Sequence, residues 1–97
     1  FILEGKNMKT RSDLFSEIAK VLYFPNYFGN NWNALDDCLQ DLDWIHSNSI
    51  KVLIRDFDKV LLEDNMKGKS IFLDCVKTAN DFWKEGQEKK VDFYIQN

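Results

Sequence analysis

The chain has 97 residues, of which 44% are hydrophobic and 30% are charged, and its formal net charge is −3. This length and composition predict one globular domain over residues 1–97. They exclude a disordered chain and a membrane-spanning helix, since no apolar run approaches the ~20 residues that a bilayer requires. The acidic balance argues against direct contact with nucleic acid, which needs a basic surface for phosphate groups. The lysines near residues 67–69 and 89–90 are interleaved with acids, and we interpret them as solubilising charge.

The start of the chain and its two cysteines bear on location. No basic-then-apolar segment opens the sequence, so nothing in it indicates secretion. Cys38 and Cys75 show neither CxxC nor metal-type spacing, and we interpret them as reduced thiols packed in the core as small apolar residues. We therefore expect a cytoplasmic protein with no cofactor and no membrane partner.

The beginning of the chain is predicted to form a strand and a helix. The apolar run at residues 1–3 is typical of a buried first strand. Ser12 is the expected N-cap of the helix that follows, with Asp13 and Glu17 near the positive end of the helix dipole. The apolar residues of this helix have helical spacing and are Leu14, Ile18, Val21 and Leu22. The helix is expected to end before Pro25, because the residue preceding proline disfavours helical backbone.

A second helix is predicted to begin between Gly29 and Asn31, where small and amide residues can cap it. Its buried stripe follows the spacing i, i+3, i+4, i+7 and consists of Leu35, Cys38, Leu39 and Leu42.

The second half of the chain is predicted to form two strands and two helices. Residues 49–55 contain a near-continuous β-branched run, which is typical of a strand covered on both faces. Residues 56–62 could form a short helix, 67–85 a longer one, and 91–96 alternate as a strand with one more exposed face. The order β-α-α-β-α-α-β predicts an α/β fold, with a three-stranded parallel sheet packed against about four helices.

Residues 25–44 combine four acids, four asparagines and four aromatic residues without a single Lys or Arg. Because the buried stripe fixes the inner side of the second helix, polar residues on its other side must face outward. These residues are Asn33, Asp37, Gln40 and Asp41, with Asp36 flanking them. Asp37 and Asp41 repel each other at i, i+4 spacing, and Asp41 lies at the negative end of the dipole. Helix stability alone therefore does not explain this distribution of charge.

Aromatic residues accompany the acids. Tyr27, Trp32 and Trp44 bracket the acidic side of the helix and could form its rim, as aromatic residues do in binding hot spots. Three others are expected to pack beneath the loop: Tyr23, Phe24 and Phe28. Composition alone leaves two interpretations open, a plain solvated helix and a face that binds a protein.

A metal site or an enzyme is a further alternative. The carboxylates near 36–43 and His46 suggest ligands, but adjacent Asp36 and Asp37 point about 100° apart on a helix and do not converge. His46 is expected in a solvated loop, and no nucleophile–base motif, glycine-rich phosphate loop or HExxH is present. We expect neither catalysis nor a bound metal.

The segment from Tyr27 to Leu39 resembles the signature of the barstar family, the intracellular inhibitors of barnase-type ribonucleases. The shared frame, which begins at Pro25, is P-x-Y-[FY]-G-x-N-x-[DN]-A-L-x-D-C-L. A looser resemblance extends over the whole chain, in the element order and in the short strands at both ends.

The resemblance implies a function and a set of contacts. Barstar-like proteins insert the second helix and the loop before it into a nuclease's active-site cleft, where an aspartate engages the basic residues that hold RNA phosphate. Asp37 occupies that aspartate's position, and other contacting positions fall at or beside Tyr27, Asn31, Trp32 and Gln40. The expected partner is one small basic ribonuclease, bound 1:1. The alternative is an adaptor that binds another basic protein through the same face.

The sequence departs from the family pattern at several positions. Asn33 stands where the family's archetype has a second acidic contact, and Asp36 stands where it has a tryptophan. The second helix, continued through 40–44, is predicted to be one or two residues longer than usual. A further acidic contact from the last helix has no clear counterpart, since Thr78 aligns near it and Asp81 is one turn on. These differences bear on which nuclease is bound.

Overall fold

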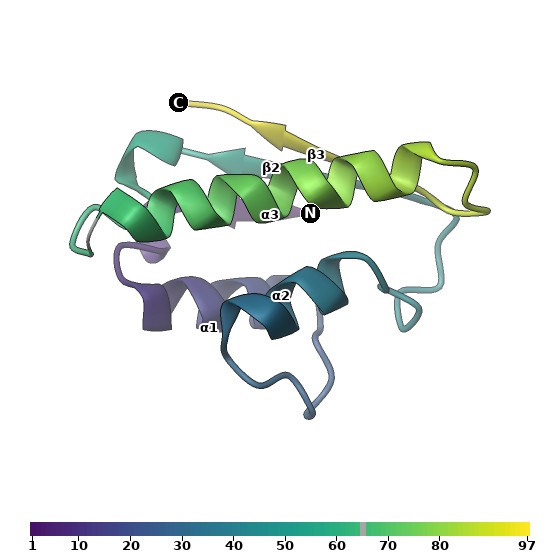
Figure 1. Cartoon of the computed structure of the whole chain (residues 1–97), viewed down its shortest axis with the longest axis horizontal. Helices are drawn as coiled ribbons and strands as arrows, with labels where there is room; N and C mark the ends of the chain where they lie inside the picture. The colour runs from purple at the N-terminus through teal and green to yellow at the C-terminus, as the bar shows by residue number, and fades with distance from the viewer. Residues whose placement is uncertain (65) are drawn as a thin grey trace.

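A computed structural model describes residues 1–64 and 66–97 (Figure 1). The elements are β1 (Ile2–Glu4), α1 (Arg11–Val21), α2 (Trp32–Leu39), β2 (Ser49–Arg55), α3 (Met66–Lys84) and β3 (Lys90–Ile95), with the 3-10 turns η1 (Gly5–Asn7) and η2 (Phe57–Lys59). The three strands pair in parallel in the order β1-β2-β3, so the α/β class and the parallel sheet are confirmed.

The number of helices differs from the prediction. The described part of the chain contains three α-helices rather than about four, because residues 56–62 form only the 3-10 turn η2. Asp56, which precedes this turn, has left-handed backbone at φ 50, and Val60 returns to extended backbone. A longer helix cannot propagate between two such residues.

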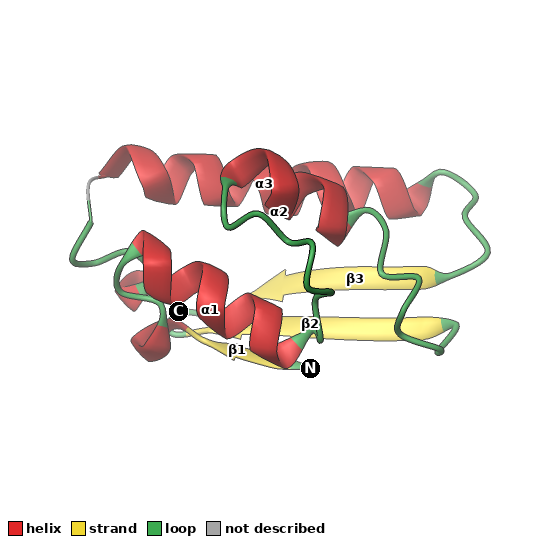
Figure 2. Ribbon diagram, turned by 90° about the horizontal axis from the view of Figure 1, so that it is seen from below, coloured by secondary structure: helices red, strands yellow, loops and turns green. Residues whose placement is uncertain are grey.

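In the part of the chain that the structure describes, helices cover one face of the sheet and leave the other open. Along β2, buried residues alternate with exposed or half-buried ones, and the buried ones are Ile50, Val52 and Ile54. Figure 2 shows α2 and α3 on the same side of the sheet. The prediction of a strand covered on both faces was therefore wrong.

The first strand also has an open side. Leu3 is buried, whereas Phe1 and Ile2 are 43% and 45% exposed. In the parallel register Ile2 pairs with Leu53, and Leu53 pairs with Tyr94. The predicted burial of the whole run 1–3 thus holds only for Leu3, because alternate side chains of a strand point to opposite faces.

The first helix begins one residue before the predicted cap. Thr10 is the N-cap, and its hydroxyl oxygen accepts a hydrogen bond from the Asp13 backbone N–H at 3.1 Å. Ser12 lies inside the first turn, so its predicted capping role was wrong. Glu17 is buried on the inner side of the helix, where its carboxylate pairs with Lys20 at 3.2 Å and accepts a weak hydrogen bond of 3.4 Å from the Glu4 N–H.

Candidate partner-binding surface

The second helix is capped where the sequence predicted. Asn31 is its N-cap, and the Asn31 side-chain oxygen accepts a hydrogen bond from the Ala34 N–H at 2.8 Å. Leu35, Cys38 and Leu39 face the core, which confirms the buried stripe within the helix. This packing fixes which residues of α2 lie outward.

The helix ends earlier than predicted. Its last residue is Leu39, and the expectation of a helix continued through 40–44 was wrong. Leu42 has left-handed backbone at φ 53 and still places its side chain in the core. Asp41 therefore lies in the turn after α2 rather than on the helix.

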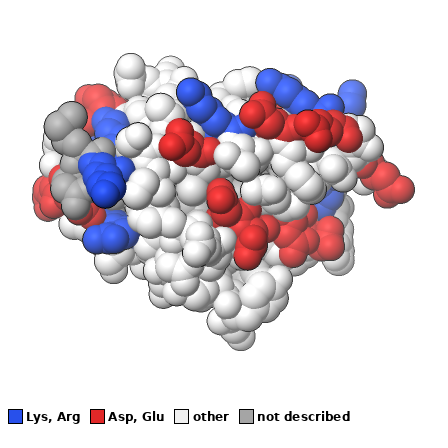
Figure 3. All heavy atoms as spheres, in the orientation of Figure 1, with Lys and Arg blue, Asp and Glu red and all other residues white. Residues whose placement is uncertain are grey.

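The predicted outward residues differ in exposure. Asn33 and Asp37 are exposed, one helical turn apart, whereas Gln40 and Asp41 are half-buried. We call these four residues the acidic face. Acidic side chains gather over α2 and the turn that follows it (Figure 3).

Asp36 is directed differently from the acidic face. It is half-buried, and its Oδ1 atom is buried and accepts no hydrogen bond from the described residues. Burial raises the pKa of the Cys75 thiol to about 12, and the nearby Asp36 carboxylate adds to this rise. Because Cys75 belongs to α3, Asp36 lies where α2 packs against α3.

Tyr27 is the most exposed of the three predicted rim residues, at 72%. Partial desolvation and then the negative charge of Asp41 raise the pKa of the Tyr27 phenol. Tyr27 is therefore near enough to Asp41 to feel its charge, and its place at the rim of a binding surface stays a prediction.

The two tryptophans are half-buried and anchored from within. The Trp32 ring packs edge-on against Phe15, with ring centroids 5.0 Å apart. The Trp44 Nε1–H donates a hydrogen bond of 2.8 Å to the carbonyl oxygen of Leu22. Both side chains therefore support the loop and are only partly exposed.

The aromatic residues of the preceding loop divide into two groups. Phe24 and Phe28 pack edge-on against each other, with ring centroids 4.9 Å apart, as predicted. Tyr23 was expected beneath the loop as well, but it is 70% exposed. Its left-handed backbone, at φ 55, follows the end of α1 and turns the side chain away from the core.

The turn after α2 is held by a residue that the sequence analysis misinterpreted. The Lys89 Nζ donates hydrogen bonds to the carbonyl oxygens of Leu42 at 2.8 Å and Ile45 at 2.7 Å. The interpretation of Lys89 as solubilising charge was therefore wrong. Trp83, from α3, similarly donates its Nε1–H to the Leu39 carbonyl oxygen at 2.8 Å. Local sequence around 83–89 contains no signal for either contact.

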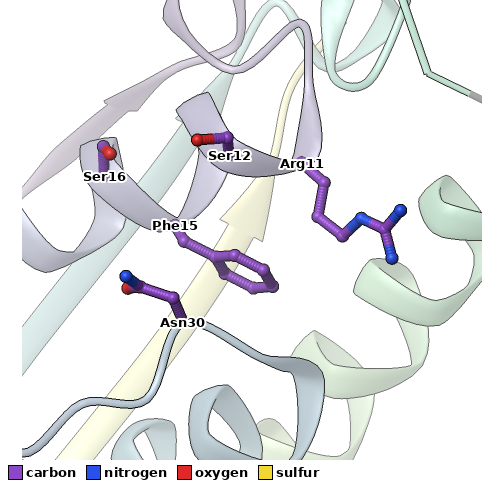
Figure 4. Close-up of a pocket in the computed structure, with 5 residues that line it drawn as sticks. All are labelled: Arg11, Ser12, Phe15, Ser16 and Asn30. Carbon is purple, nitrogen blue, oxygen red and sulfur yellow. The ribbon is translucent and has the colours of Figure 1, made fainter.

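A separate hollow of about 320 Å³ lies beside α1 and the loop before α2 (Figure 4). Its central side chain is Phe15, which also packs against Trp32, and Arg11 and Asn30 lie to either side of the ring. Arg11 is close to Asp64, at 3.9 Å between Nε and Oδ2. This hollow exposes the underside of the loop's aromatic packing and none of the predicted site residues.

Two observations on the described residues bear on the alternatives to a protein-binding face. Among the described residues, no three His, Cys, Asp or Glu side chains converge as a metal site requires. His46 is exposed, as expected for a loop residue. None of the helices in residues 1–64 and 66–97 has the length and apolar character needed to cross a membrane.

Taken together, the fold and this surface define a small α/β domain that presents acidic and aromatic side chains on one helix and its adjoining loops. The family model described as Barstar (barnase inhibitor) matches residues 1–96, and the chain belongs to this family. The comparison with curated proteins found no match. The fold and the resemblance at residues 25–39 agree with the family membership.

Proposed function

We propose that the chain is an intracellular inhibitor of a barnase-like ribonuclease, of the immunity or antitoxin type, and binds it 1:1. The acidic face of α2 and the loop before it would enter the active-site cleft. The observation that carries this proposal is the exposure of Asp37 on α2, within a stretch of 30 residues, 21 to 50, that contains no lysine or arginine. The family description, Barstar (barnase inhibitor), supports it.

The chemistry of a ribonuclease cleft explains why such a face would fit. The cleft must hold arginines and lysines to bind phosphate, so a competitor needs carboxylates on a rigid support. Asp37 has that support, since α2 is capped by Asn31 and packed through Leu35 and Leu39. The carboxylate would take the place of a phosphate group, and the nuclease could no longer bind RNA.

The residues around Asp37 would complete the contact. Tyr27 is exposed near the acidic turn, and Trp32 and Trp44 offer partly exposed rings that can exclude water from the charged contacts. Asn33 is exposed one turn before Asp37 and supplies an amide where a carboxylate would add charge. Asn33→Asp should therefore tighten binding only to a nuclease with a further cation opposite this position.

Asp36 contributes differently. It lies beside Cys75 of α3 with one carboxylate oxygen buried, so only its exposed portion can meet the partner. Asp36, which stands where the family's archetype has a tryptophan, therefore lies partly against α3 and partly at the surface.

The test is a set of inhibition titrations against a panel of barnase-like ribonucleases. Asp37→Ala should weaken inhibition by about 3–5 kcal/mol, more than a hundredfold, because it leaves buried cations of the nuclease unpaired. Asp58→Ala is the control, since Asp58 is an exposed acid in η2. Equal potency of wild type and Asp37→Ala would remove Asp37 from the site. No inhibition of any panel member would favour the adaptor.

A further inference from the structure

A hollow of about 400 Å³ adjoins the acidic face. It lies between four segments: the turn after α2, the end of α3, the loop that leads to β3, and the loop before β2, which contributes Asn48. Asp41 belongs both to the acidic face and to the wall of this hollow, so the two surfaces are continuous. A protein bound over α2 would therefore also cover the hollow.

The walls of the hollow are fixed by contacts within the protein. Trp83, on one wall, is tied to the last carbonyl of α2 through its Nε1–H. Lys89, on another, donates to two carbonyl oxygens of the turn after α2, at 2.8 and 2.7 Å. These contacts join the turn after α2 to the end of α3 and to the loop before β3, and the Lys90 N–H is bound to the Asn48 carbonyl oxygen. The hollow is therefore preformed rather than created by a partner.

The charge of the hollow is negative. The acids that line it are Asp41, Asp43 and Glu88, and Lys89 is the one cation among its described lining residues. The Lys89 ammonium donates hydrogen bonds to backbone carbonyl oxygens. Burial and then the charge of Asp43 raise the pKa of Asp41, against a smaller opposing effect of Lys89.

Aromatic side chains complete the lining. Phe82 and Trp83 both border the hollow and pack edge-on against each other, with ring centroids 4.9 Å apart. Carboxylates beside aromatic rings suit the guanidinium group of arginine, which is planar, forms paired hydrogen bonds with carboxylates and stacks on rings. A lysine would use the charge alone, and an anion would be repelled.

We propose that this hollow seats an arginine side chain that the ribonuclease carries outside its catalytic cleft. This inference rests on the proposed inhibition and extends it: the acidic face blocks the cleft, and the hollow selects among ribonucleases by the arginine beside it. A nuclease without that arginine would cover the carboxylates of the hollow and leave them unpaired. Because this costs free energy, such a nuclease should bind more weakly than one that carries the arginine.

The first experiment compares two double variants with the same change in net charge. Asp43→Asn/Glu88→Gln removes two carboxylates of the hollow, and Asp58→Asn/Glu63→Gln removes two exposed acids elsewhere. Against a ribonuclease that the wild type inhibits, the hollow variant should bind at least about tenfold more weakly and the control should bind nearly as the wild type. Urea unfolding of all three checks that stability is unchanged.

The second experiment identifies the arginine. Arginines outside the cleft of the inhibited ribonuclease are replaced one at a time by alanine, and affinity is measured for the wild type and the hollow variant. One replacement should weaken binding of the wild type about tenfold and that of the hollow variant much less, which is the coupling expected of a direct contact. Inhibition that persists without any such coupling, or equal affinity of the two double variants, overturns the inference and leaves the proposed function standing. A wild type that inhibits no ribonuclease overturns both.

Discussion

Asp36 and Asp37 are adjacent in the sequence but lie in different surroundings. Successive helical residues point about 100° apart, so Asp37 is exposed whereas one oxygen of Asp36 is buried against α3. The spacing of Leu35 and Leu39 was enough to predict the exposure of Asp37. It could not predict the proximity of Asp36 to Cys75, because that depends on how α3 packs on α2.

Gly5 is a position where any side chain would disrupt the fold. A Cβ built there would collide with the carbonyl oxygen of Asp56 and lie 2.7 Å from that of Arg55, and backbone atoms cannot rotate away. Gly5→Ala should therefore lower the free energy of unfolding by about 3 kcal/mol or more in urea denaturation. Gly86→Ala is the control: its backbone has φ +80 but nothing lies within 4 Å of the new Cβ, so a loss of about 1–2 kcal/mol is expected. A smaller loss at Gly5 than at Gly86 would contradict the close approach of η1 to residues 55–56.

Cys75 makes stability depend on pH in the alkaline range. Its pKa is raised from 9.0 to about 12, chiefly by burial, so the folded protein holds this proton more tightly than the unfolded chain. The resulting stabilisation is fully present below pH 9 and is lost progressively as the pH rises toward 12. The unfolding free energy of Cys75→Ala should consequently fall less between pH 8 and pH 10 than that of the wild type, as measured in urea. Parallel curves for the two proteins would show that the thiol is not buried as described.

At the scale of elements, the sequence predicted which segments are helical better than it predicted where the helices begin and end. One side of each of α1, α2 and α3 is buried, so apolar residues recur there about every 3.6 residues, and this pattern is easily recognised in the sequence. Thr10 and Ser12 are both good capping residues, and the choice of Thr10 depends on how the chain arrives from η1. Leu42 fits the helical pattern yet lies beyond the end of α2, because Lys89 and Trp83 bind the carbonyls of this region from distant parts of the chain.

The turn after α2 should loosen when its distant anchor is removed. Lys89→Met keeps most of the apolar length of the side chain but removes both hydrogen bonds to the Leu42 and Ile45 carbonyls. Hydrogen bonds from charged groups contribute about 1.5–3 kcal/mol, so a loss of that order in unfolding free energy is expected, with faster amide exchange over residues 40–45. Lys90→Met is the matched control, because the Lys90 side chain is exposed and its hydrogen bond to the Asn48 carbonyl oxygen is made by the backbone N–H, which the substitution keeps. Identical exchange in the two variants would argue against the anchoring role.

At the scale of the whole molecule, the one-sided sheet was the feature that local patterns predicted least well. Leu53 interrupts the alternation of β2 and makes the run 50–54 look buried on both faces. In the structure it is half-buried between Ile2 and Tyr94 on the open side of the sheet. Only the placement of the helices decides which face is covered, and that depends on contacts between residues far apart in the chain.

The charge distribution over the molecule leads to a kinetic prediction. Acidic side chains gather over α2 and the adjoining turn (Figure 3). Lys67 and Lys69 lie in the first turn of α3, whereas the hollow beside the acidic face is at the end of that helix. A basic ribonuclease should therefore be steered toward the acidic face, and its association rate should fall steeply as ionic strength rises from about 0.05 to 0.5 M, where screening shortens the range of the attraction.

The rate constants for variants should separate steering from contact, as stopped-flow mixing with an inhibited ribonuclease can measure. Asp58→Asn/Glu63→Gln changes net charge away from the site, so it should slow association modestly and leave dissociation unchanged. Asp37→Ala removes a carboxylate that the complex would bury, so it should mainly speed dissociation, and that effect should persist at high salt. An association rate that does not vary with salt would contradict the steering by the acidic face. An Asp37→Ala effect confined to association would mean that Asp37 attracts the nuclease without entering its cleft.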